Sequence, residues 1–257
     1  MFLIIKYGKF YYKNYNVYII TFIKKSLNNE RNILSYGLFN GMNAGVDIYG
    51  KSVRIIDSIL KDDEHFNDSY TEAEKPVVKR VIHATSDVSY AETIFFTNNS
   101  AEKSIGLIKE KVIKNEPLKI VCDSEMTRAG ISRNVNKNII LDLNCYINSI
   151  EMPPDAGTTK SAFSIKAAIN EILPDIIIIG NAPTALTGAM EICDELYKTI
   201  NYKPSLIIGM PVGFVGAAES KAALYKNSFY NAIGNFGNLG GSSSAASAMN
   251  ALLRESL

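Results

Sequence analysis

The residue in this sequence that is best suited to proton transfer is a histidine. The chain has two histidines, and His83 stands in the run RVIHATSD, where Arg80 precedes it by one helical turn and Thr85 follows it. An unperturbed imidazole titrates near about pH 6.5, so small shifts let it give or take a proton at neutral pH. We therefore predict that His83 is catalytic and that Arg80 and Thr85 bind substrate beside it; a structural histidine is the alternative. His65 stands among acidic residues and is expected on the surface.

Three loops that contain glycine form the second group of candidate residues. They span residues 180–186, 209–216 and 240–244, and each leads into a predicted helix. Backbone N–H groups at a helix N-terminus favour anions, so three such loops together predict a site for a ligand with several carboxylates. Tight turns and helix caps without a ligand are the alternative. The predicted ligand contacts in these loops are Asn181, Thr184, Gly213, Phe214, Gly240, Gly241 and Ser242.

The glycine spacing argues against a dinucleotide site. Gly180 stands alone in its loop, and the next loop has glycines at 209, 213 and 216, so neither loop has the G-x-G-x-x-G pattern. An acidic residue that could bind a ribose is not evident about 20 residues further on. A nicotinamide-dependent dehydrogenase is therefore the weaker interpretation of these loops.

Hydrophobic patterning places the loops at the ends of strands. Short β-branched runs predict strands over residues 119–122, 139–143, 176–179 and 205–208. Amphipathic stretches predict helices over residues 100–114, 159–173, 184–200, 217–226 and 242–254. The predicted fold class is therefore α/β, a single domain with a mainly parallel β-sheet flanked by helices. Its ligand site is expected at the carboxyl ends of the strands.

Two further helices are expected before the sheet. The first spans residues 46–60, and its predicted apolar face consists of Ile48, Ser52, Ile55, Ile56, Ile59 and Leu60. The second begins at residues 74–76, where proline suits a first helical turn. Its predicted buried residues are Val77, Val78, Val81 and Ile82.

Charge and cysteine content exclude several classes of protein. The chain has 27 Lys and Arg against 26 Asp and Glu, a net charge of +1, so a nucleic-acid partner is not expected. Residues 1–41 hold six cations and one anion, which leaves residues 42–257 mildly acidic, so local basic groups must gather any anionic ligand. Three separated cysteines without a C-x-x-C pair, and only two histidines, predict no metal site and reduced thiols in a cytoplasmic protein.

Residues 1–41 differ in composition from the remainder and are expected to be an N-terminal appendage to a domain of residues 42–257. The longest uncharged run there, residues 14–23, is about half of the ~20 residues that span a bilayer. A small-residue cleavage site does not follow it, so neither a membrane helix nor a secretory signal is predicted. The crowding of Phe, Tyr, Lys, Asn and Ile, which have A/T-rich codons, favours Met42 as the working start.

Four motifs, taken together, resemble one enzyme family. They are KPVVKRVIHATSD, IIIIGNAPTAL, PSLIIGMPVGFVGAAESK and GGSSSAASAMNALL, and with them residues 46–253 resemble the precorrin-8X methylmutases of cobalamin biosynthesis. The resemblance implies an isomerase that moves a methyl group from C-11 to C-12 of precorrin-8 or cobalt-precorrin-8, giving hydrogenobyrinate or cobyrinate. It also implies a homodimer of α/β subunits that binds an anionic corrin precursor near the subunit interface and needs no cofactor.

The resemblance also assigns residues. His83 matches the family's catalytic histidine, a proton donor and acceptor, while Arg80 and Ser52 match substrate contacts. Where relatives have Gly-x-Thr-Arg, residues 157–160 read GTTK, and Leu239 stands where a basic residue is common. Lys160 and Lys221 are expected to compensate as substrate-binding cations. These departures leave open a second interpretation, a tetrapyrrole-binding or carrier protein without turnover.

Overall fold

A computed structural model describes most of the chain. The described residues are 3–6, 9–12, 44–133, 137–153 and 157–257. They belong to two compact units, residues 1–55 and residues 56–257.

The first unit contains a hairpin and most of a helix. Strand β1 (Leu3–Lys6) pairs antiparallel with β2 (Lys9–Tyr12), which the sequence pattern did not predict, and helix α3 (Ala44–Leu60) runs on into the second unit. The run at 14–23 and the predicted start at Met42 lie outside the described residues. The appendage therefore stays a prediction.

A six-stranded sheet forms the centre of the second unit, in the order β3-β8-β7-β6-β4-β5. All neighbouring strands are parallel except β3, which pairs antiparallel with β8 at one edge. The strands are β3 (Ile94–Phe96), β4 (Leu118–Cys122), β5 (Leu141–Asn144), β6 (Ile176–Ile179), β7 (Leu206–Gly209) and β8 (Ala232–Asn235). The predicted α/β class is confirmed, and a strand forms in each of the four predicted regions, although β5 begins two residues later than predicted. Strands β3 and β8 were not predicted.

Strand β6 shows why the sheet needs helices on both faces. All four of its isoleucines are fully buried. Side chains alternate across a strand, and Ile176 and Ile178 belong to one hydrophobic cluster while Ile177 and Ile179 belong to another. The sheet is therefore the middle layer of three.

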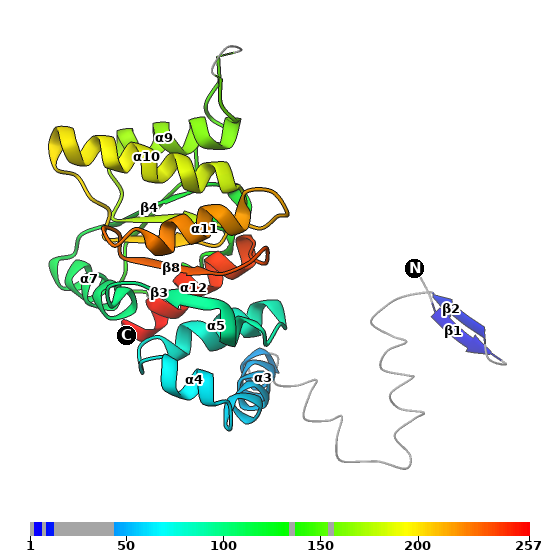
Figure 1. Cartoon of the computed structure of the whole chain (residues 1–257). Helices are drawn as coiled ribbons and strands as arrows, with labels where there is room; N and C mark the ends of the chain where they lie inside the picture. Colours follow the sequence, from blue (N-terminus) through cyan, green and yellow to red (C-terminus); the bar gives the residue numbers. More distant parts are fainter. Residues whose placement is uncertain (1–2, 7–8, 13–43, 134–136, 154–156) are drawn as a thin grey trace. The chain divides into compact units, whose positions relative to one another are not determined.

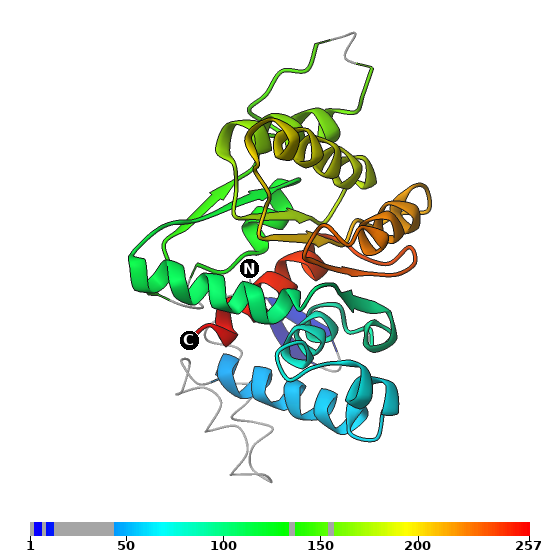
Figure 2. The ribbon, with the colours of Figure 1, turned by 60° about the vertical axis from the view of Figure 1, so that its left-hand side comes forward.

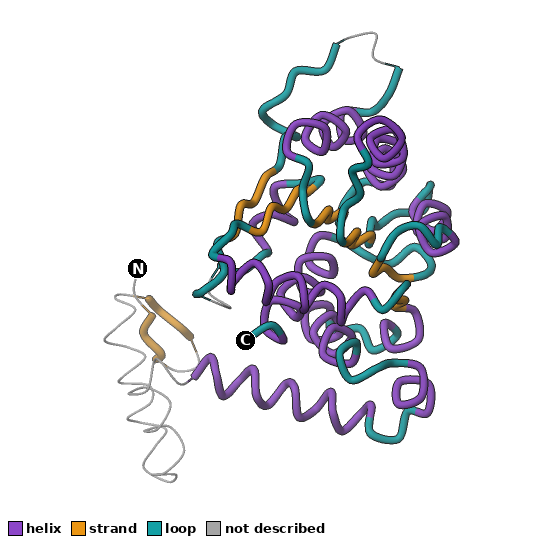
Figure 3. The backbone as a smooth tube through the Cα atoms, turned by 90° about the vertical axis from the view of Figure 1, so that its left-hand side faces the viewer, coloured by secondary structure: helices purple, strands orange, loops and turns teal. Residues whose placement is uncertain are grey.

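Two groups of helices cover the two faces. Figure 1 shows α9, α10 and α11 on one side of the sheet and α5, α7 and α12 on the other, and Figure 2 shows the same separation from another side. The strands lie between the two groups in Figure 3. The helices of the second unit are α4 (Glu64–Ser69), α5 (Lys75–Thr85), α6 (Tyr90–Thr93), α7 (Ser100–Lys114), α8 (Glu125–Gly130), α9 (Lys160–Ile172), α10 (Pro183–Ile200), α11 (Ala217–Lys226) and α12 (Ser242–Glu255). Within the described ranges, no helix has the length and apolar character that crossing a bilayer requires.

The two predicted helices before the sheet differ in how they bury their apolar residues. In α5 all four predicted inward residues are buried. In α3 the predicted face is wrong in part, because Ile56 and Leu60 are buried while Ile48, Ile55 and Ile59 are exposed. Residues 56 and 60 lie one turn apart, so the stripe that packs against the core is narrower than the apolar pattern indicated.

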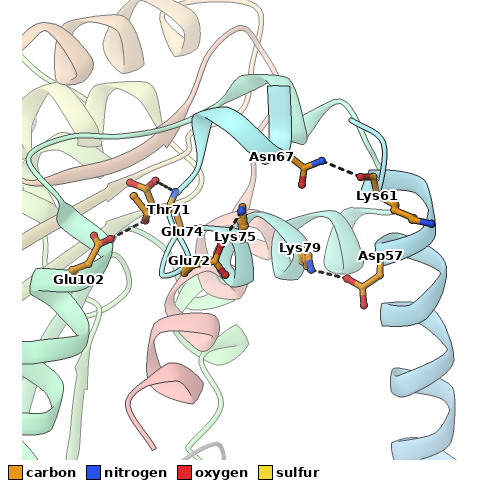
Figure 4. A network of polar contacts seen from close by, with 9 residues as sticks. All are labelled: Asp57, Lys61, Asn67, Thr71, Glu72, Glu74, Lys75, Lys79 and Glu102. Carbon is orange, nitrogen blue, oxygen red and sulfur yellow. Dashed lines mark hydrogen bonds and ion pairs between the residues drawn. The ribbon is translucent and has the colours of Figure 1, made fainter. Parts of the chain in front are cut away.

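Polar contacts fix the end of α3 and the neighbouring helices. Lys79 Nζ of α5 lies 2.6 Å from Asp57 Oδ1 of α3, and the Asn67 amide donates to the backbone oxygen of Lys61 over 3.0 Å (Figure 4). Glu74, just before α5, accepts a 2.9 Å bond from the backbone N–H of Thr71. These contacts secure the approach to α5, the helix that carries His83.

Residues 45–52, GVDIYGKS, have the glycine, lysine and serine spacing of a phosphate-binding P-loop. That motif requires a strand followed by a loop whose backbone N–H groups surround the phosphates. Here the whole stretch is helical, within α3. These residues therefore do not form a nucleotide-binding site in this fold.

Candidate active site

The carboxyl ends of the parallel strands bring three predicted loops together. A β-carbon on Gly180, just after β6, would lie 2.8 Å from the Cα of Ser242, the first residue of α12. A β-carbon on Gly216, just before α11, would lie 3.4 Å from the Cβ of Pro183, the first residue of α10. The starts of α10, α11 and α12 are therefore neighbours, as the sequence predicted.

The backbone N–H groups of the loop before α10 bind a carboxylate of the protein itself. The carboxylate of Asp123, at the end of β4, accepts the backbone N–H of Gly180 at Oδ1 (3.0 Å) and those of Asn181 and Ala182 at Oδ2 (2.8 and 2.9 Å). The prediction that these N–H groups face a ligand is therefore wrong. Because β4 lies directly beside β6, its first residue beyond the strand reaches the loop that follows β6.

Asp123 is almost entirely enclosed, with 4% of its surface exposed. Burial raises the pKa of Asp123, and hydrogen bonds from the Gly180, Ala182 and Asn181 N–H groups and from the Thr127 hydroxyl act in the opposite direction. The Thr127 hydroxyl lies 3.3 Å from Asp123 Oδ1. The carboxylate thus supplies the negative charge that this helix start favours.

Three hydroxyl groups join the start of α12 to α8. Ser242 Oγ lies 2.9 Å from Thr127 Oγ1 and 3.2 Å from Ser124 Oγ, and the last two atoms are 2.8 Å apart. Ser242 was predicted to contact substrate, but its residue is buried and its hydroxyl has protein partners. A direct contact with substrate stays a prediction, and the observed role is to fix the helix start.

The starts of α9 and α10 present the polar side chains predicted there to solvent. Asn181, Thr184 and Lys160 are exposed. Thr184 Oγ1 lies 2.8 Å from Thr159 Oγ1, and Thr159 caps α9 by accepting the backbone N–H of Ala162 over 3.2 Å. Lys160 is the first residue of that helix, so the structure brings the three predicted contacts to one edge.

The loop after β7 is exposed at its tip. Phe214 is 92% exposed, and the neighbouring Gly213 donates its backbone N–H to the carbonyl of Asn238 over 3.1 Å. This bond joins the loop to the one that precedes α12. In that second loop Gly240 cannot be replaced without movement, because a β-carbon there would lie 2.7 Å from the carbonyl oxygen of Pro211. Gly213, Phe214, Gly240 and Gly241 therefore lie on two adjoining loops.

Lys221 was expected to bind substrate as a compensating cation, but it lies in the interior of the protein. Its residue is fully buried, and its ammonium group donates to the carbonyl of Leu239 and, over 3.4 Å, to Asn235 Oδ1. Burial lowers the pKa of Lys221 to about 8. The predicted direct contact with substrate does not fit this position, because the ammonium group is enclosed and holds the loop before α12 from within.

His83 lies near the end of α5 and is partly buried. Burial, and then the charge of Arg80, lower the pKa of His83 below that of an ordinary imidazole. The Thr85 hydroxyl donates to the carbonyl of Val81 over 2.9 Å and accepts the N–H of Asp87 over 3.3 Å, so it closes the helix end. A neutral imidazole beside a guanidinium group is suited to accept a proton at neutral pH.

A bond beyond α5 places this helix end beside the start of α12. Helix α5 packs along α12, and Tyr90, seven residues after His83, has its hydroxyl 2.9 Å from Ser244 Oγ. Ser244 belongs to the first turn of α12, at the carboxyl edge of the sheet. The segment that directly follows α5 therefore lies at the predicted edge.

Ser52 lies in α3, within the unit of residues 1–55, and is partly buried. Its predicted contact with substrate stays a prediction. Among the residues that the structure describes, no group of three or more His, Cys, Asp and Glu side chains could hold a metal ion.

Comparison with known proteins identifies the family. The sequence profile of the precorrin-8X methylmutases matches residues 47–255. The chain belongs to this family.

Relatives and solved structures agree with this assignment. A cobalt-precorrin-8 methylmutase of Methanocaldococcus jannaschii is 37% identical over 185 residues, 70% of this chain and 80% of the relative. One of Leptospira interrogans is 36% identical over 221 residues, 82% of this chain and 94% of the relative. The structure of a precorrin-8X methylmutase from Thermus thermophilus has a TM-score of 0.65 at 27% identity and covers 81% of this chain and 96% of that one. The resemblance inferred from the four motifs is confirmed.

For this member of the precorrin-8X methylmutase family, sequence reasoning overlooked Asp123 and Thr127. The available signal was an acidic residue directly after a predicted strand, in the run KIVCDSEMT. Its importance depends on the order of strands, because β4 and β6 are neighbours although β5 lies between them in the sequence. A single sequence does not reveal that order.

Proposed function

We propose that this precorrin-8X methylmutase family member is an isomerase that moves a methyl group from C-11 to C-12 of precorrin-8 or cobalt-precorrin-8. The product is hydrogenobyrinate or cobyrinate. The observation that carries the proposal is the partly buried His83, whose pKa is lowered, on a helix end tied to the carboxyl edge of the sheet. The family membership gives the reaction class.

His83 is the proton donor and acceptor in this proposal. In its neutral form the imidazole takes a proton from the conjugated macrocycle and returns one as the methyl group changes carbon atoms. The bond from the methyl group to C-11 breaks and the bond to C-12 forms, so neither protons nor electrons are consumed. The reaction needs no hydride acceptor and no nucleophile, and we propose that the protein uses no cofactor.

Side chains hold the carboxylates of the anionic corrin precursor in this proposal. Lys160, Asn181 and Thr184 are exposed at the starts of α9 and α10, and Arg80 accompanies His83. Backbone N–H groups of the loop before α10 are excluded from that task, because Asp123 occupies them. The exposed ring of Phe214 offers an apolar surface to the macrocycle.

We also propose that the protein is a cytoplasmic homodimer, as the family resemblance implies. The exposed Ile48, Ile55 and Ile59 lie at helical spacing on α3, where a second copy would cover them. Sedimentation of the full chain at micromolar concentration should give twice the monomer mass, and Ile55→Lys should lower it. Lys61→Ala, on the same helix-loop segment, is the control. The free cysteines suit a reducing compartment.

The function is tested by anaerobic incubation of the full chain with metal-free and with cobalt-bearing precorrin-8, each labelled with ¹³C in the migrating methyl group. The expected result is a changed visible spectrum and a methyl resonance that shows attachment to C-12. Stoichiometric binding without any change in methyl attachment would instead support the carrier interpretation and contradict the isomerase.

A further inference from the structure

Of the carboxylates named at the carboxyl edge of the sheet, that of Asp123 accepts the most hydrogen bonds. Each of its oxygens accepts two hydrogen bonds within 3.3 Å: Oδ1 from Gly180 and Thr127, and Oδ2 from Asn181 and Ala182. The residue is 4% exposed, so substrate has no access to these oxygens. Whatever Asp123 contributes to function must act through the groups that it holds.

Those groups lead directly to the predicted substrate contacts. The loop that Asp123 holds contains Asn181 and runs into α10, where Thr184 is the second residue. Thr184 Oγ1 is 2.8 Å from Thr159 Oγ1, and Thr159 caps the helix that Lys160 begins. A continuous path of hydrogen bonds and short backbone segments thus joins the buried carboxylate to an exposed cation.

We propose that Asp123 is a positioning residue that fixes the substrate-binding edge before the substrate arrives. Its carboxylate holds the loop of residues 180–182, and through this loop it fixes the positions of Asn181, Thr184 and Lys160, which bind the side-chain carboxylates of a corrin precursor. This role rests on the proposed function. Preorganised contacts bind more tightly because the ordering cost is met in the folded protein.

The chemistry of the contacts requires a carboxylate at this position. All four partners donate hydrogen bonds, which a carboxylate can accept at both oxygens. An asparagine has the same shape, but its amide nitrogen would face backbone N–H donors on one side. Asp123→Asn therefore loosens the loop without opening a cavity.

A matched control lies at the opposite end of the neighbouring strand, β6. Asp175, just before β6, accepts the backbone N–H of Lys119 over 2.9 Å and pairs with Lys111 at 3.3 Å. Asp175→Asn also removes a carboxylate that bonds backbone, but at the amino edge of the sheet. It should affect stability without affecting binding.

The experiment measures KM for precorrin-8, kcat, and the dissociation constant of hydrogenobyrinate by visible titration. Asp123→Asn should raise KM and the dissociation constant about tenfold, the order of one charge-assisted hydrogen bond, with kcat within about twofold. Asp175→Asn should leave all three unchanged. Thr127→Val, which removes one donor to Asp123, should give a smaller rise in KM and serves if Asp123→Asn does not fold.

A double-mutant cycle separates positioning from general destabilisation. If Asp123 acts through Lys160, the losses of affinity in Asp123→Asn and Lys160→Met overlap, so the double variant binds more tightly than the product of the two losses predicts. Additive losses, or an unchanged KM in a folded Asp123→Asn or Thr127→Val protein, would overturn the inference. If the wild-type chain binds hydrogenobyrinate without converting precorrin-8, the proposed function fails while the binding cycle still tests Asp123.

Discussion

The hydroxyl groups of Tyr90 and Ser244 lie 2.9 Å apart, and both residues are buried. This contact joins the segment that follows α5 to the first turn of α12. Because α5 carries His83 near its end, the contact ties the proposed proton carrier to the edge of the sheet where the loops gather. Two segments more than 150 residues apart in the sequence are thus in direct contact.

Replacement of Tyr90 by Phe should reduce kcat more than it changes KM. The variant loses one buried hydrogen bond, so the free energy of unfolding should fall by about 1 kcal/mol, and the end of α5 is held less firmly. Urea unfolding and steady-state kinetics measure the two effects. Tyr202→Phe is the control, because its hydroxyl donates to the carbonyl of Pro174 over 2.7 Å at the opposite edge. An equal loss of kcat in both variants would contradict the account.

The pH at which kcat/KM falls in acid solution, the acid limb of its pH profile, should depend on Arg80. The pKa of His83 is lowered by burial and by the charge of Arg80, so the imidazole is neutral at pH 7 and able to accept a proton. Activity should therefore fall only as the pH drops below about 6.5, the ordinary value for histidine. Arg80→Gln removes one of the two causes and should move the limb to higher pH. A limb that stays in place or moves to lower pH would show that another group controls it.

Lys221 should make stability depend on pH in alkaline solution. Burial lowers its pKa to about 8 in the folded protein, while the unfolded chain keeps its proton to about pH 10.4. Between these values the unfolded state binds more protons, so this group makes the free energy of unfolding rise with pH, by at most ~1.4 kcal/mol per pH unit. Urea unfolding at pH 7, 8, 9 and 10 should show that rise in the wild type relative to Lys221→Met. Parallel curves for the two proteins would refute the assignment.

Lys160→Arg should be tolerated or should tighten binding. The side chain is exposed at the start of α9, so stability should change by less than about 0.5 kcal/mol. A guanidinium group can bind a carboxylate with two parallel bonds, which an ammonium group cannot. Titration with hydrogenobyrinate measures the effect, and Lys166→Arg, whose residue pairs with Glu191 on α10, is the control. A large loss of affinity in a folded Lys160→Arg protein would count against the carboxylate clamp.

Elements that depend only on the local sequence could be predicted from it. Strand β6 is four isoleucines between Asp175 and Gly180, and its predicted and observed bounds are identical. Strand β8 has the sequence AIGN, in which glycine and asparagine disfavour a strand, so it was not predicted. Its pairing with β7 on one side and β3 on the other makes it a strand. That pairing is a property of the assembled sheet.

In the candidate site, too, some features follow from the local sequence and others only from the tertiary structure. The helix starts and the end of α5 follow from glycine, proline and apolar spacing, and the structure brings them to one edge. The bonding of residues 180–182 to Asp123 depends on strand order, and the burial of Lys221 depends on packing between α11 and the loop before α12. Residue type predicted which groups are polar, but tertiary structure decides which of them meet solvent.

The variant His83→Ala tests whether the imidazole transfers the proton during methyl migration. The variant removes the imidazole from a partly exposed position, so hydrogenobyrinate should bind with an affinity close to that of the wild type. Single-turnover conversion of ¹³C-methyl precorrin-8 should be slower by at least ~10²-fold, as expected when a general acid-base group is lost. The expected result for this variant is binding without methyl migration. Migration at a rate near that of the wild type would contradict it.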